Sequence, residues 1–501
     1  MKMVQKSKVK NARVGVVILA AGKGTRMRSS LPKVLQEVGG QPLLFHVLNS
    51  VLKTASQAPI AIVIGHEKEQ IQKKVLADER FKKMNLTWIH QEQQNGTGHA
   101  AKTVMDSEWG TQRVKSKEHV LVLPGDLPLI QNNLIEQMIQ PLVRGTALRL
   151  LSCTMDDPTG YGRVVRRGKK GSVLRIVEQK DANAREKLIQ EVATSIYLFN
   201  PSFLRAGLRQ LNNKNASKEY YLTDLIAQAA KVKKKIESLA WETPQDLKGV
   251  NNPWELSQAG LLLNQRCLYE WSQKGVRFMD PASTWVESTV EFDSDVFVYP
   301  GAILKGNTKI ESNVVIGPRV YLENTTVKKG SELKIGTVAY DSVVGSGAKV
   351  GPYAHLRPGT KVGNKVKIGN FVELKQSEVG EETSIAHLSY IGDAKVGSRV
   401  NIGCGFVTCN FDGQIRDGKR KHKTVIEDDV FMGSDCQTVA PVTVGKGAYV
   451  ASGSTITKNV DSGDMAIARS RQVNKKGYAK RFRSQEKKVI QPKGEANLCV
   501  E

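Results

Sequence analysis

The first half of the chain alternates short aliphatic runs with segments whose apolar residues recur at helical spacing. Residues 16–20, 60–64 and 120–123 are continuous aliphatic runs, typical of strands that are buried on both faces. Residues 43–51 and 69–76 carry apolar side chains every three or four positions, as amphipathic helices do. This alternation predicts an α/β fold with a doubly wound, Rossmann-like domain, in which helices cover both faces of a largely parallel sheet.

Ligands of such domains gather where the strands end, at the carboxyl edge of the sheet. The first predicted strand is followed by the loop Gly22–Arg28, of sequence GKGTRMR. We therefore expect the first ligand site of the chain at this loop.

The segment from residue 253 to residue 271 has no strand pattern, and its apolar residues recur every four positions. The recurring residues are Ala259, Leu263, Cys267 and Trp271, with Leu256 and Leu268 widening the stripe. This spacing predicts one long connecting helix.

Beyond residue 285 aliphatic side chains recur every sixth residue, a period that fits neither a strand nor a helical turn. They are Val298, Leu304, Ile310, Ile316 and Leu322, then Val344, Val350, Leu356, Val362, Ile368 and Leu374, and later Val444, Val450 and Ile456. Glycine follows many of them. Such hexapeptide repeats are typical of a left-handed parallel β-helix, in which each aliphatic residue stacks on the one a coil below.

The six-residue period breaks at residues 412–423 (DGQIRDGKRKHK), which must leave the β-helix as a loop. A basic, hydrated loop needs no function, yet a loop that leaves a β-helix near a histidine is also a place where a site can be built. Taken together, the patterns predict a basic N-terminal tail (1–13), an α/β domain (14–250), a linker helix (251–280), a β-helix (281–468) and a basic C-terminal tail (469–501).

Composition excludes a disordered or membrane-spanning chain. The 501 residues are 40% hydrophobic and 25% charged, which implies two or more globular domains. No run approaches the roughly 18 apolar residues of a membrane-spanning helix. Basic residues precede the apolar run at residues 14–21 and imitate a signal peptide, but that run is short and leads directly into the glycine loop.

Six cysteines in a chain of this length form no CxxC pair and no zinc spacing with histidine. We therefore expect reduced thiols in a reducing compartment, which together with the missing signal peptide predicts a cytoplasmic location.

The net charge of +25 is concentrated in the two tails and in one loop. Residues 1–13 carry five basic and no acidic residues, residues 469–501 carry ten Lys or Arg against three Glu, and residues 414–423 carry five basic residues against Asp417. Such tails usually serve solubility and attract polyanions loosely, so we favour this interpretation over a dedicated nucleic-acid site. A polynucleotide binder would show salt-sensitive binding that is lost on removal of residues 470–501.

The most specific local motif is LAAGKGTRM at residues 19–27, followed by LPK at residues 31–33. Its glycines let backbone N–H groups approach phosphates, and Lys23, Arg26 and Lys33 supply charge that stabilises a transferring phosphoryl group. The motif matches neither GxxxxGK[ST] nor GxGxxG. The alternative interpretation is a glycine turn with solvated cations.

Several further segments agree with this motif and together carry a resemblance to a known family. They are Gln91 with NGTGHA (95–100), GDLP (125–128), DPTGYGR (157–163), Glu178 in VEQKDA, EYYLTD (219–224) and GVNN (249–252). Over roughly residues 14–470 the chain closely resembles the bacterial bifunctional N-acetylglucosamine-1-phosphate uridylyltransferase/glucosamine-1-phosphate N-acetyltransferase family. The resemblance leaves out only the tails.

The resemblance implies a uridylyltransferase site in the α/β domain. Asp126 and Asn251 would hold Mg²⁺, while Lys33 and Arg26 neutralise charge as the sugar phosphate attacks the α-phosphorus of UTP and expels pyrophosphate. The residues implied to contact UTP or the nucleotide sugar are Leu19, Ala20, Gly22, Lys23, Gly24, Lys33, Gln91, Gly96, Thr97, Gly162, Glu178 and Asn251. Among them, the resemblance assigns Gln91, Gly96 and Thr97 to the segment that contacts uracil, and Gly162 and Glu178 to the segment that contacts the sugar. Judged from its spacing alone, Asp126 would more often be a plain acid at a strand end.

One departure from the family falls inside this site. The family carries an asparagine, a hydrogen-bond donor to the nucleotide sugar, where this chain has Ala193. Losing one uncharged hydrogen bond costs on the order of 0.5–1.5 kcal/mol. The departure therefore bears on sugar affinity or selectivity and leaves the reaction type unchanged.

A second set of residues lies on the predicted β-helix and is implied to transfer an acetyl group. The resemblance assigns His387 as the base, because a free amine is mostly ammonium at neutral pH and its attack on a thioester needs a base of suitable pKa. Without the resemblance, one histidine in a β-helix would more often be structural. The residues implied to hold the sugar phosphate are Arg357, Lys375, Tyr390, Asn401 and Lys421, with Glu373 near the base.

The implied acetyl-CoA groove, which the family builds between subunits of a trimer, is lined by Cys404, Asn410, Phe411, Ser434, Ser452 and Arg469. Cys404 and Ser452 stand where alanine is usual, Phe411 stands where tyrosine is usual, and an insertion at residues 414–420 lengthens the basic loop. These departures could weaken acetyl transfer or adapt it to another acyl donor.

We therefore expect a homotrimeric enzyme that acetylates glucosamine-1-phosphate with acetyl-CoA and then uridylylates N-acetylglucosamine-1-phosphate with UTP. Its product would be UDP-N-acetylglucosamine, which feeds peptidoglycan and lipopolysaccharide synthesis. One alternative is a uridylyltransferase whose β-helix acts as a scaffold or uses a different acyl donor. Another is a non-catalytic assembly protein, against which the intact Lys33, Asp126 and Asn251 argue.

Overall fold

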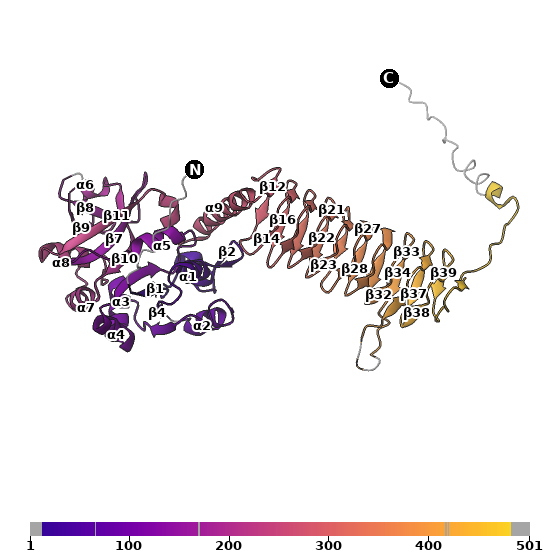
Figure 1. Ribbon diagram of the computed structural model, residues 1–501, viewed down its shortest axis with the longest axis horizontal. Coiled ribbons are helices and arrows are strands. Elements are labelled where there is room, and N and C mark those ends of the chain that lie inside the picture. Colours follow the sequence, from indigo (N-terminus) through magenta and orange to yellow (C-terminus); the bar gives the residue numbers. More distant parts are fainter. Residues whose placement is uncertain (1–12, 66, 169–170, 416–417, 419, 482–501) are drawn as a thin grey trace, which may run out of the picture. The chain divides into compact units, whose positions relative to one another are not determined.

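The computed structural model describes residues 13–481 except 66, 169–170, 416–417 and 419, and the chain divides into two compact units (Figure 1). The first unit runs to Lys274 and also contains Trp285–Val290 and Leu304–Gly306, and the second contains Gly275–Thr284, Glu291–Ile303 and the chain from Asn307. The predictions for the tails at 1–12 and 482–501, and for part of the basic loop, fall outside the described residues. No described helix has both the length and the hydropathy that a bilayer crossing requires.

Within the described residues a nine-stranded mixed sheet forms the centre of the first unit. In spatial order its strands are β11 (Lys235–Trp241), β7 (Thr146–Thr154), β10 (Glu191–Phe199), β6 (His119–Pro124), β1 (Val14–Leu19), β4 (Ile60–Ile64) and β5 (Leu86–His90), with β8 (Gly162–Arg166) on β10 and β9 (Val173–Val177) on β8. Strands β6, β1, β4 and β5 are parallel, whereas β10 runs antiparallel to both β6 and β7. The predicted strands are confirmed as β1, β4 and β6.

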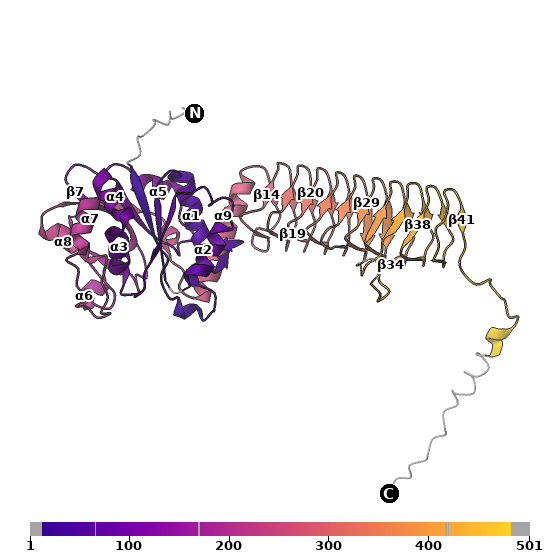
Figure 2. The ribbon, with the colours of Figure 1, turned by 90° about the horizontal axis from the view of Figure 1, so that it is seen from below.

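Helices cover both faces of this sheet (Figure 2). The described helices up to residue 250 are α1 (Leu43–Thr54), α2 (Lys68–Leu76), α3 (Thr97–Asp106), α4 (Glu108–Ser116), α5 (Asn132–Met138), α6 (Ala184–Lys187), α7 (Pro201–Leu208) and α8 (Asp224–Lys231), with 3₁₀ turns η1 (Thr25–Met27), η2 (Lys33–Leu35) and η3 (Pro244–Leu247). Among them, α6 buries no side chain. A small ribbon, β2 (Glu37–Val38) and β3 (Gln41–Pro42), lies between η2 and α1 in the chain. The predicted helices at 43–51 and 69–76 are confirmed as α1 and α2.

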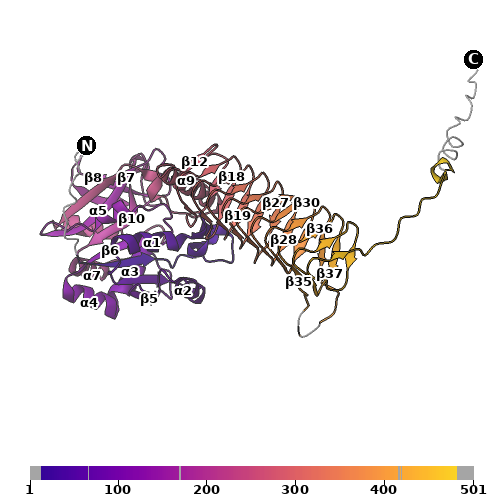
Figure 3. The same cartoon turned by 45° about the vertical axis from the view of Figure 1, so that its right-hand side comes forward.

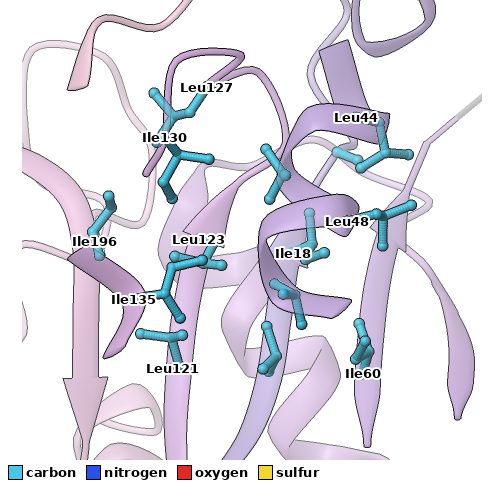
Figure 4. Packing of buried hydrophobic residues seen from close by; sticks show 14 of the residues in the cluster. Ile18, Leu44, Leu48, Ile60, Leu121, Leu123, Leu127, Ile130, Ile135 and Ile196 are labelled. Atoms are coloured by element: carbon cyan, nitrogen blue, oxygen red, sulfur yellow. The ribbon is translucent and has the colours of Figure 1, made fainter. Parts of the chain in front are cut away.

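Strand β1 shows why the first predicted strand is continuously aliphatic. Ile18 packs on one side of the sheet in a cluster with Leu48 of α1 and Ile135 of α5 (Figure 4). The preceding residue, Val17, points to the opposite side of the sheet and belongs to a cluster with Val104 of α3. Because successive side chains of a strand point to opposite faces, a strand covered on both sides must be apolar at every position.

The predicted connecting helix is confirmed as α9 (Pro253–Ser272). It begins at Asn252, whose side chain accepts from the backbone N–H of Glu255, and Pro253 occupies the first helical position, where its missing N–H costs nothing. Ala259 is buried with Val38 of the first unit. The helix therefore packs on the α/β domain through one apolar stripe.

From β12 onward the chain forms a parallel β-helix, as predicted from the six-residue period, and its coils are visible in Figure 3. Three parallel sheets make up its faces. The first face contains β12 (Arg277–Phe278), β15 (Phe297–Val298), β18 (Val315–Ile316), β21 (Glu332–Leu333), β24 (Lys349–Val350), β27 (Lys367–Asn370), β30 (Ser384–His387), β33 (Asn401–Ile402), β36 (Phe431–Met432), β39 (Tyr449–Val450) and β41 (Met465–Ala466).

The other two faces have the same construction. The second face contains β13 (Trp285–Val286), β16 (Ile303–Lys305), β19 (Tyr321–Glu323), β22 (Val338–Tyr340), β25 (His355–Leu356), β28 (Glu373–Lys375), β31 (Tyr390–Gly392), β34 (Val407–Cys409), β37 (Gln437–Val439) and β40 (Thr455–Ile456). The third face contains β14 (Glu291–Phe292), β17 (Lys309–Ile310), β20 (Thr326–Val327), β23 (Val343–Val344), β26 (Lys361–Val362), β29 (Glu378–Val379), β32 (Ala394–Val396), β35 (Thr424–Ile426) and β38 (Val442–Val444).

The aliphatic residues of the repeat form the core of the β-helix. Ile368 stacks on Ile385 in the next coil, and both are fully buried. The register places partners 17 or 18 residues apart along most of the helix, but Ile402 pairs with Met432, a separation of 30 residues. The extra residues belong to the loop between Cys409 and Thr424, so the predicted break in the period is confirmed.

Candidate functional site

The glycine loop after β1 brings the backbone close to Lys33. Gly24 lies at φ +60°, in the left-handed region, and a Cβ there would come within 2.5 Å of the Lys33 Cβ. Any larger residue would therefore displace Lys33. A cavity of about 250 Å³ opens beside the loop, and its walls include Ala20, Gly22, Lys23 and Lys33.

Lys33 joins the two residues predicted to hold a metal. Its Nζ lies 2.5 Å from Asp126 Oδ2 and donates to Asn251 Oδ1 at 2.9 Å. Arg26 Nη2 donates to the same Asn251 oxygen at 3.3 Å. The end of β1 reaches this cluster too, because Leu19 O accepts from the N–H of Gly125 at 2.9 Å. Four residues that the sequence places far apart are thus brought together.

Glu255, which the sequence prediction missed, fixes the orientation of Asn251. Its Oε2 accepts from the backbone N–H of Asn251 at 2.7 Å and from Asn251 Nδ2 at 3.2 Å. Because a carboxylate only accepts, Asn251 must turn its NH₂ group toward Glu255 and its Oδ1 toward Lys33. The signal was present in the sequence, since Asn252 followed three residues later by Glu255 is a capping-box pattern.

The donor set around Lys33 fits a hard divalent cation. Asp126 and Asn251 offer a carboxylate oxygen and an amide oxygen, the ligand types that Mg²⁺ prefers. Both oxygens already approach a cationic nitrogen. The described residues contain no group of three or more His, Cys, Asp or Glu side chains suited to a metal, so Mg²⁺ held here would need substrate phosphates and water to complete its coordination.

The segment predicted to contact uracil lies at the start of α3. Gln91 is 4% exposed, and its Nε2 donates to Gly96 O at 3.4 Å and to His99 Nδ1 at 2.9 Å. Gly96 has φ +99°, and a Cβ there would collide with the backbone of Tyr220. Thr97 Oγ1 accepts from the N–H of Leu222 at 3.3 Å, so the EYYLTD segment holds this end of the helix.

The segment predicted to contact the sugar is equally compact. A Cβ on Gly162 would lie 2.7 Å from Ile176 and 3.4 Å from the Glu178 carboxylate. Burial raises the pKa of Glu178 above its usual value, against the opposing effect of the hydrogen bond from Thr223 Oγ1 at 2.8 Å. Ala193 pairs with Gly162 between β10 and β8, so the departure noted at this position lies directly beside a predicted sugar contact.

On the β-helix, the second face collects most of the residues predicted to bind the sugar phosphate. Arg357 Nη1 donates to Glu373 Oε1 at 2.9 Å. Glu373 is in register with Tyr390 in the next coil. No contact among the described residues joins Glu373 to His387, so that expected neighbourhood stays a prediction.

Asn401 and Lys421 lie apart from this group within one chain. Asn401 begins β33 on the first face, and Lys421 belongs to the long loop, where its Nζ lies 4.3 Å from the centre of the Phe411 ring. Between the described parts of the chain, no bond links either residue to Lys375 or Tyr390.

His387 begins a row of predicted acetyl-CoA residues. It ends β30, and the register Ile385–Ile402 continued by two residues aligns it with Cys404. The N–H of Asp435 donates to Cys404 O at 2.7 Å, which places Ser434 on the following coil. The row then passes from Ser434 to Ser452, because the N–H of Gly453 donates to Ser434 O at 2.8 Å, and it ends at Arg469, whose Cδ would lie 3.7 Å from a Cβ on Gly453.

Comparison with known proteins covers both units. Residues 16–183 match the family described as MobA-like NTP transferase domain. Residues 341–376 match the bacterial transferase hexapeptide family, and residues 423–458 match the hexapeptide repeat of succinyl-transferase.

Curated relatives extend the match over nearly the whole chain. Three proteins named Bifunctional protein GlmU are similar to it. That of Trichlorobacter lovleyi is 41% identical over 92% of this chain and 97% of its own length. That of Clostridioides difficile is 41% identical over 93% of this chain and 97% of its own length, and that of Desulfitobacterium hafniense is 42% identical over 91% of this chain and 96% of its own length. With identity at this level and coverage of both domains, the chain belongs to the family of the bifunctional protein GlmU.

Proposed function

We propose that this chain makes UDP-N-acetylglucosamine by two transfers: acetyl from acetyl-CoA to glucosamine-1-phosphate, then uridylyl from UTP to the N-acetylated product. The observation that carries the proposal is the contact of Lys33 with both Asp126 and Asn251, in a chain that aligns over 92% of its length with a bifunctional relative. The resemblance supplies the substrates, and the site chemistry agrees with them.

Uridylyl transfer in the first unit is a matter of positioning and charge. Asp126 and Asn251 would hold Mg²⁺, which would supply Lewis-acid chemistry toward phosphate oxygens. Lys33 and Arg26 neutralise the negative charge that builds up as a phosphate oxygen of the sugar attacks the α-phosphorus and pyrophosphate leaves. Gln91, whose Nε2 is engaged by the protein, presents its Oε1 as an acceptor for the N3–H of uracil.

Acetyl transfer takes place on the β-helix. His387 removes a proton from the amine of glucosamine-1-phosphate as the nitrogen attacks the thioester carbonyl, and the same proton leaves with the sulfur of CoA. Arg357 and Lys375 bind the sugar phosphate by charge-assisted hydrogen bonds. Cys404 and its row form the acetyl-CoA groove.

We also propose a homotrimer, located in the cytoplasm, where UTP and acetyl-CoA are made. A trimer is supported by the separation of Asn401 and Lys421 from Lys375 within one chain, because a neighbouring subunit can complete the site. Mixing His387→Ala with Asn401→Ala chains tests this idea. Restored acetyl transfer in the mixture supports sites shared between subunits, and no restoration contradicts them.

A uridylyltransferase with altered acyl chemistry is the second candidate, and one observation favours it. Cys404 and Ser452, which replace alanine in the family, lie in the same row as His387. Compared with alanine, the thiol of Cys404 and the hydroxyl of Ser452 make the groove for the acyl group narrower or more polar.

A single assay separates the two candidates. Purified protein receives glucosamine-1-phosphate, acetyl-CoA, UTP and Mg²⁺, and free thiol and pyrophosphate are followed together, with N-acetylglucosamine-1-phosphate as a second starting substrate. The proposed function predicts both signals from glucosamine-1-phosphate. Pyrophosphate from the acetylated sugar alone would support the second candidate, and no pyrophosphate from either sugar would contradict both.

A further inference from the structure

Asp393 lies in the turn between β31 and β32, beside residues predicted to act in acetyl transfer. Its φ is +50°, in the left-handed region, and its side chain is 18% exposed. Its backbone N–H donates to Lys375 O at 2.9 Å, and its carbonyl accepts from the N–H of Thr424 at 3.3 Å. The turn is therefore fixed from both sides, by the coil before it and by the strand that follows the long loop.

One carboxylate oxygen of Asp393 reaches two predicted substrate residues. Asn410 Nδ2 donates to Asp393 Oδ2 at 2.5 Å. Lys375 Nζ lies 4.0 Å from the same oxygen. Asp393 thus joins a residue predicted for the acetyl-CoA groove to a residue predicted for the sugar phosphate.

The contact decides how the Asn410 amide is turned. A carboxylate accepts and cannot donate, so it takes the NH₂ group of the amide. The same Nδ2 also approaches Tyr390 Oη at 3.5 Å. Asn410 is 5% exposed, and among the described residues its Oδ1 has no hydrogen-bond partner. That oxygen is left as an acceptor for a ligand.

Gly392, the residue before Asp393, leaves room for this arrangement. A Cβ on Gly392 would lie 2.5 Å from Tyr390 Oη and 2.6 Å from Asn410 Nδ2. A Cβ essentially never lies this close to an atom to which it is not bonded, so any side chain at this position would push Asn410 away from Asp393. The orientation of Asn410 therefore depends on two neighbouring residues of one turn.

We propose that Asp393 is a positioning residue of the acetyl-transfer site. By holding Nδ2 of Asn410, it directs Oδ1 to accept an N–H of the glucosamine-1-phosphate amine. With one N–H held in this way, the nitrogen lone pair is oriented for attack on the thioester carbonyl. This inference rests on the proposed acetyl transfer and adds to it a residue that touches no substrate.

The alternative explanation is that Asp393 serves only its turn, since aspartate tolerates the left-handed conformation better than most residues. Asp341 provides a matched comparison. It occupies the corresponding turn between β22 and β23 with φ +41°, and it accepts from Asn324 Nδ2 at 3.1 Å on the exposed surface. A purely structural role predicts that equal substitutions at Asp341 and Asp393 have equal effects.

The test uses four full-length variants: Asp393→Gly, Asp393→Asn, Asp341→Gly and Asn410→Ala. Glycine fits both turns without strain, and asparagine retains an oxygen that accepts from Asn410. We expect Asp393→Gly to lower kcat for CoA release at least tenfold, with the KM for acetyl-CoA unchanged. Asp393→Asn should retain most of the kcat that Asp393→Gly loses. Asp341→Gly should leave kcat unchanged, and uridylyl transfer should be unchanged in all four.

A double-mutant cycle completes the experiment, because a residue that acts through Asn410 has nothing further to lose once Asn410 is gone. In the Asn410→Ala background, Asp393→Gly should have no additional effect on kcat. Equal kcat for Asp393→Gly and Asp341→Gly, or fully additive losses in the cycle, would overturn the positioning role of Asp393. The proposed acetyl transfer would stand after either result. Wild-type protein that releases no CoA with glucosamine-1-phosphate would overturn the proposed acetyl transfer and this role together.

Discussion

The ammonium of Lys33 lies 2.5 Å from the carboxylate of Asp126, inside the space that the two predicted metal ligands share. Its second bond, to Asn251, completes a bridge between the same two oxygens that Mg²⁺ would bind. The lysine therefore acts as a counter-ion for the pair. A divalent cation bound to these oxygens would displace Lys33, and the freed ammonium would be available to the phosphates of the proposed nucleotide substrate.

This relationship predicts that Lys33→Ala binds a divalent cation more tightly than the unchanged protein when no nucleotide is present. We expect Mn²⁺ affinity to rise at least about fivefold, since a unit charge about 4 Å away is worth on the order of 1 kcal/mol in bulk water and about 4 kcal/mol at an intermediate dielectric constant. Electron paramagnetic resonance of free Mn²⁺ measures the affinity directly. Lys74→Ala, which removes an exposed lysine paired with Glu37, is the control. Unchanged or weaker binding by Lys33→Ala would show that the two cations do not compete.

The two reactions should be separable by single substitutions. Asp126→Ala should abolish pyrophosphate release and spare CoA release, because it removes one predicted metal ligand, and that residue lies in the first unit. His387→Ala should do the reverse and lower CoA release by about 10²–10⁴-fold, the usual contribution of a general base. CoA release is measured from glucosamine-1-phosphate and pyrophosphate release from N-acetylglucosamine-1-phosphate, so that a loss of acetyl transfer does not deprive the second reaction of its substrate. Loss of both signals in either variant would mean that the two sites depend on each other.

Ala193→Asn should add the sugar contact that the resemblance implies for an asparagine at this position. Because Ala193 pairs with Gly162, the new amide would lie beside the predicted sugar segment. We expect the KM for N-acetylglucosamine-1-phosphate to fall by roughly 2–10-fold, corresponding to one hydrogen bond of about 0.5–1.5 kcal/mol. Steady-state kinetics with UTP held at saturation measures this. An unchanged KM would show that another group has replaced the missing amide.

Glu178→Gln should stabilise the protein at neutral pH. Since burial raises the pKa of Glu178 above its usual value of 4.5, the folded state binds the proton more tightly than the unfolded state. Stability is therefore lost as the pH rises through the interval from the usual to the raised pKa, and the penalty is fully present above it. The variant should melt higher than the unchanged protein at pH 7 and equally at pH 4. A melting difference that is the same at both pH values would refute the ionisation argument.

Asp246→Ala should destabilise the first unit strongly. Asp246 is fully buried and accepts from Gln131 Nε2 at 2.7 Å, from Trp241 Nε1 at 2.8 Å and from Arg266 of α9. The Arg266 side chain is 32% exposed, so the loss comes mainly from the unpaired donors of Gln131 and Trp241. An unsatisfied donor costs about 1–3 kcal/mol, so denaturant unfolding should show a loss of about 2–5 kcal/mol. Glu37→Ala breaks only an exposed pair with Lys74 and should cost less than about 1 kcal/mol. Equal losses would contradict the importance of this buried carboxylate.

Local pattern predicted the elements because each period has a single geometric source. The aliphatic run at 60–64 is β4 and the four-residue spacing after residue 253 is α9, because burial on a strand or on one side of a helix repeats with the element itself. The six-residue period likewise predicted the core of the β-helix, down to buried residues such as Val350 and Leu356. Long-range partners leave no such trace. Strand β10 runs antiparallel to β6, although the other strands at the centre of the sheet are parallel. The residues of β10 carry no pattern that indicates this direction.

The candidate site divides in the same way. Motifs and the resemblance singled out Lys33, Asp126 and Asn251, because the residue types and their local spacing are visible in the chain. Glu255 belongs to a capping-box pattern, which indicated the start of a helix. The pattern did not indicate that Glu255 would also orient Asn251, a predicted metal ligand.

The sequence by itself determined the two kinds of domain, the repeat that builds the β-helix, and the chemistry of the residues at each site. Only the tertiary structure decided that the ammonium of Lys33 bridges Asp126 and Asn251, and that one oxygen of Asp393 holds Asn410 near Lys375. The physical reason is range. Periodicity records whether a side chain is buried, whereas hydrogen-bond partners depend on coils and loops that folding brings together from distant parts of the chain.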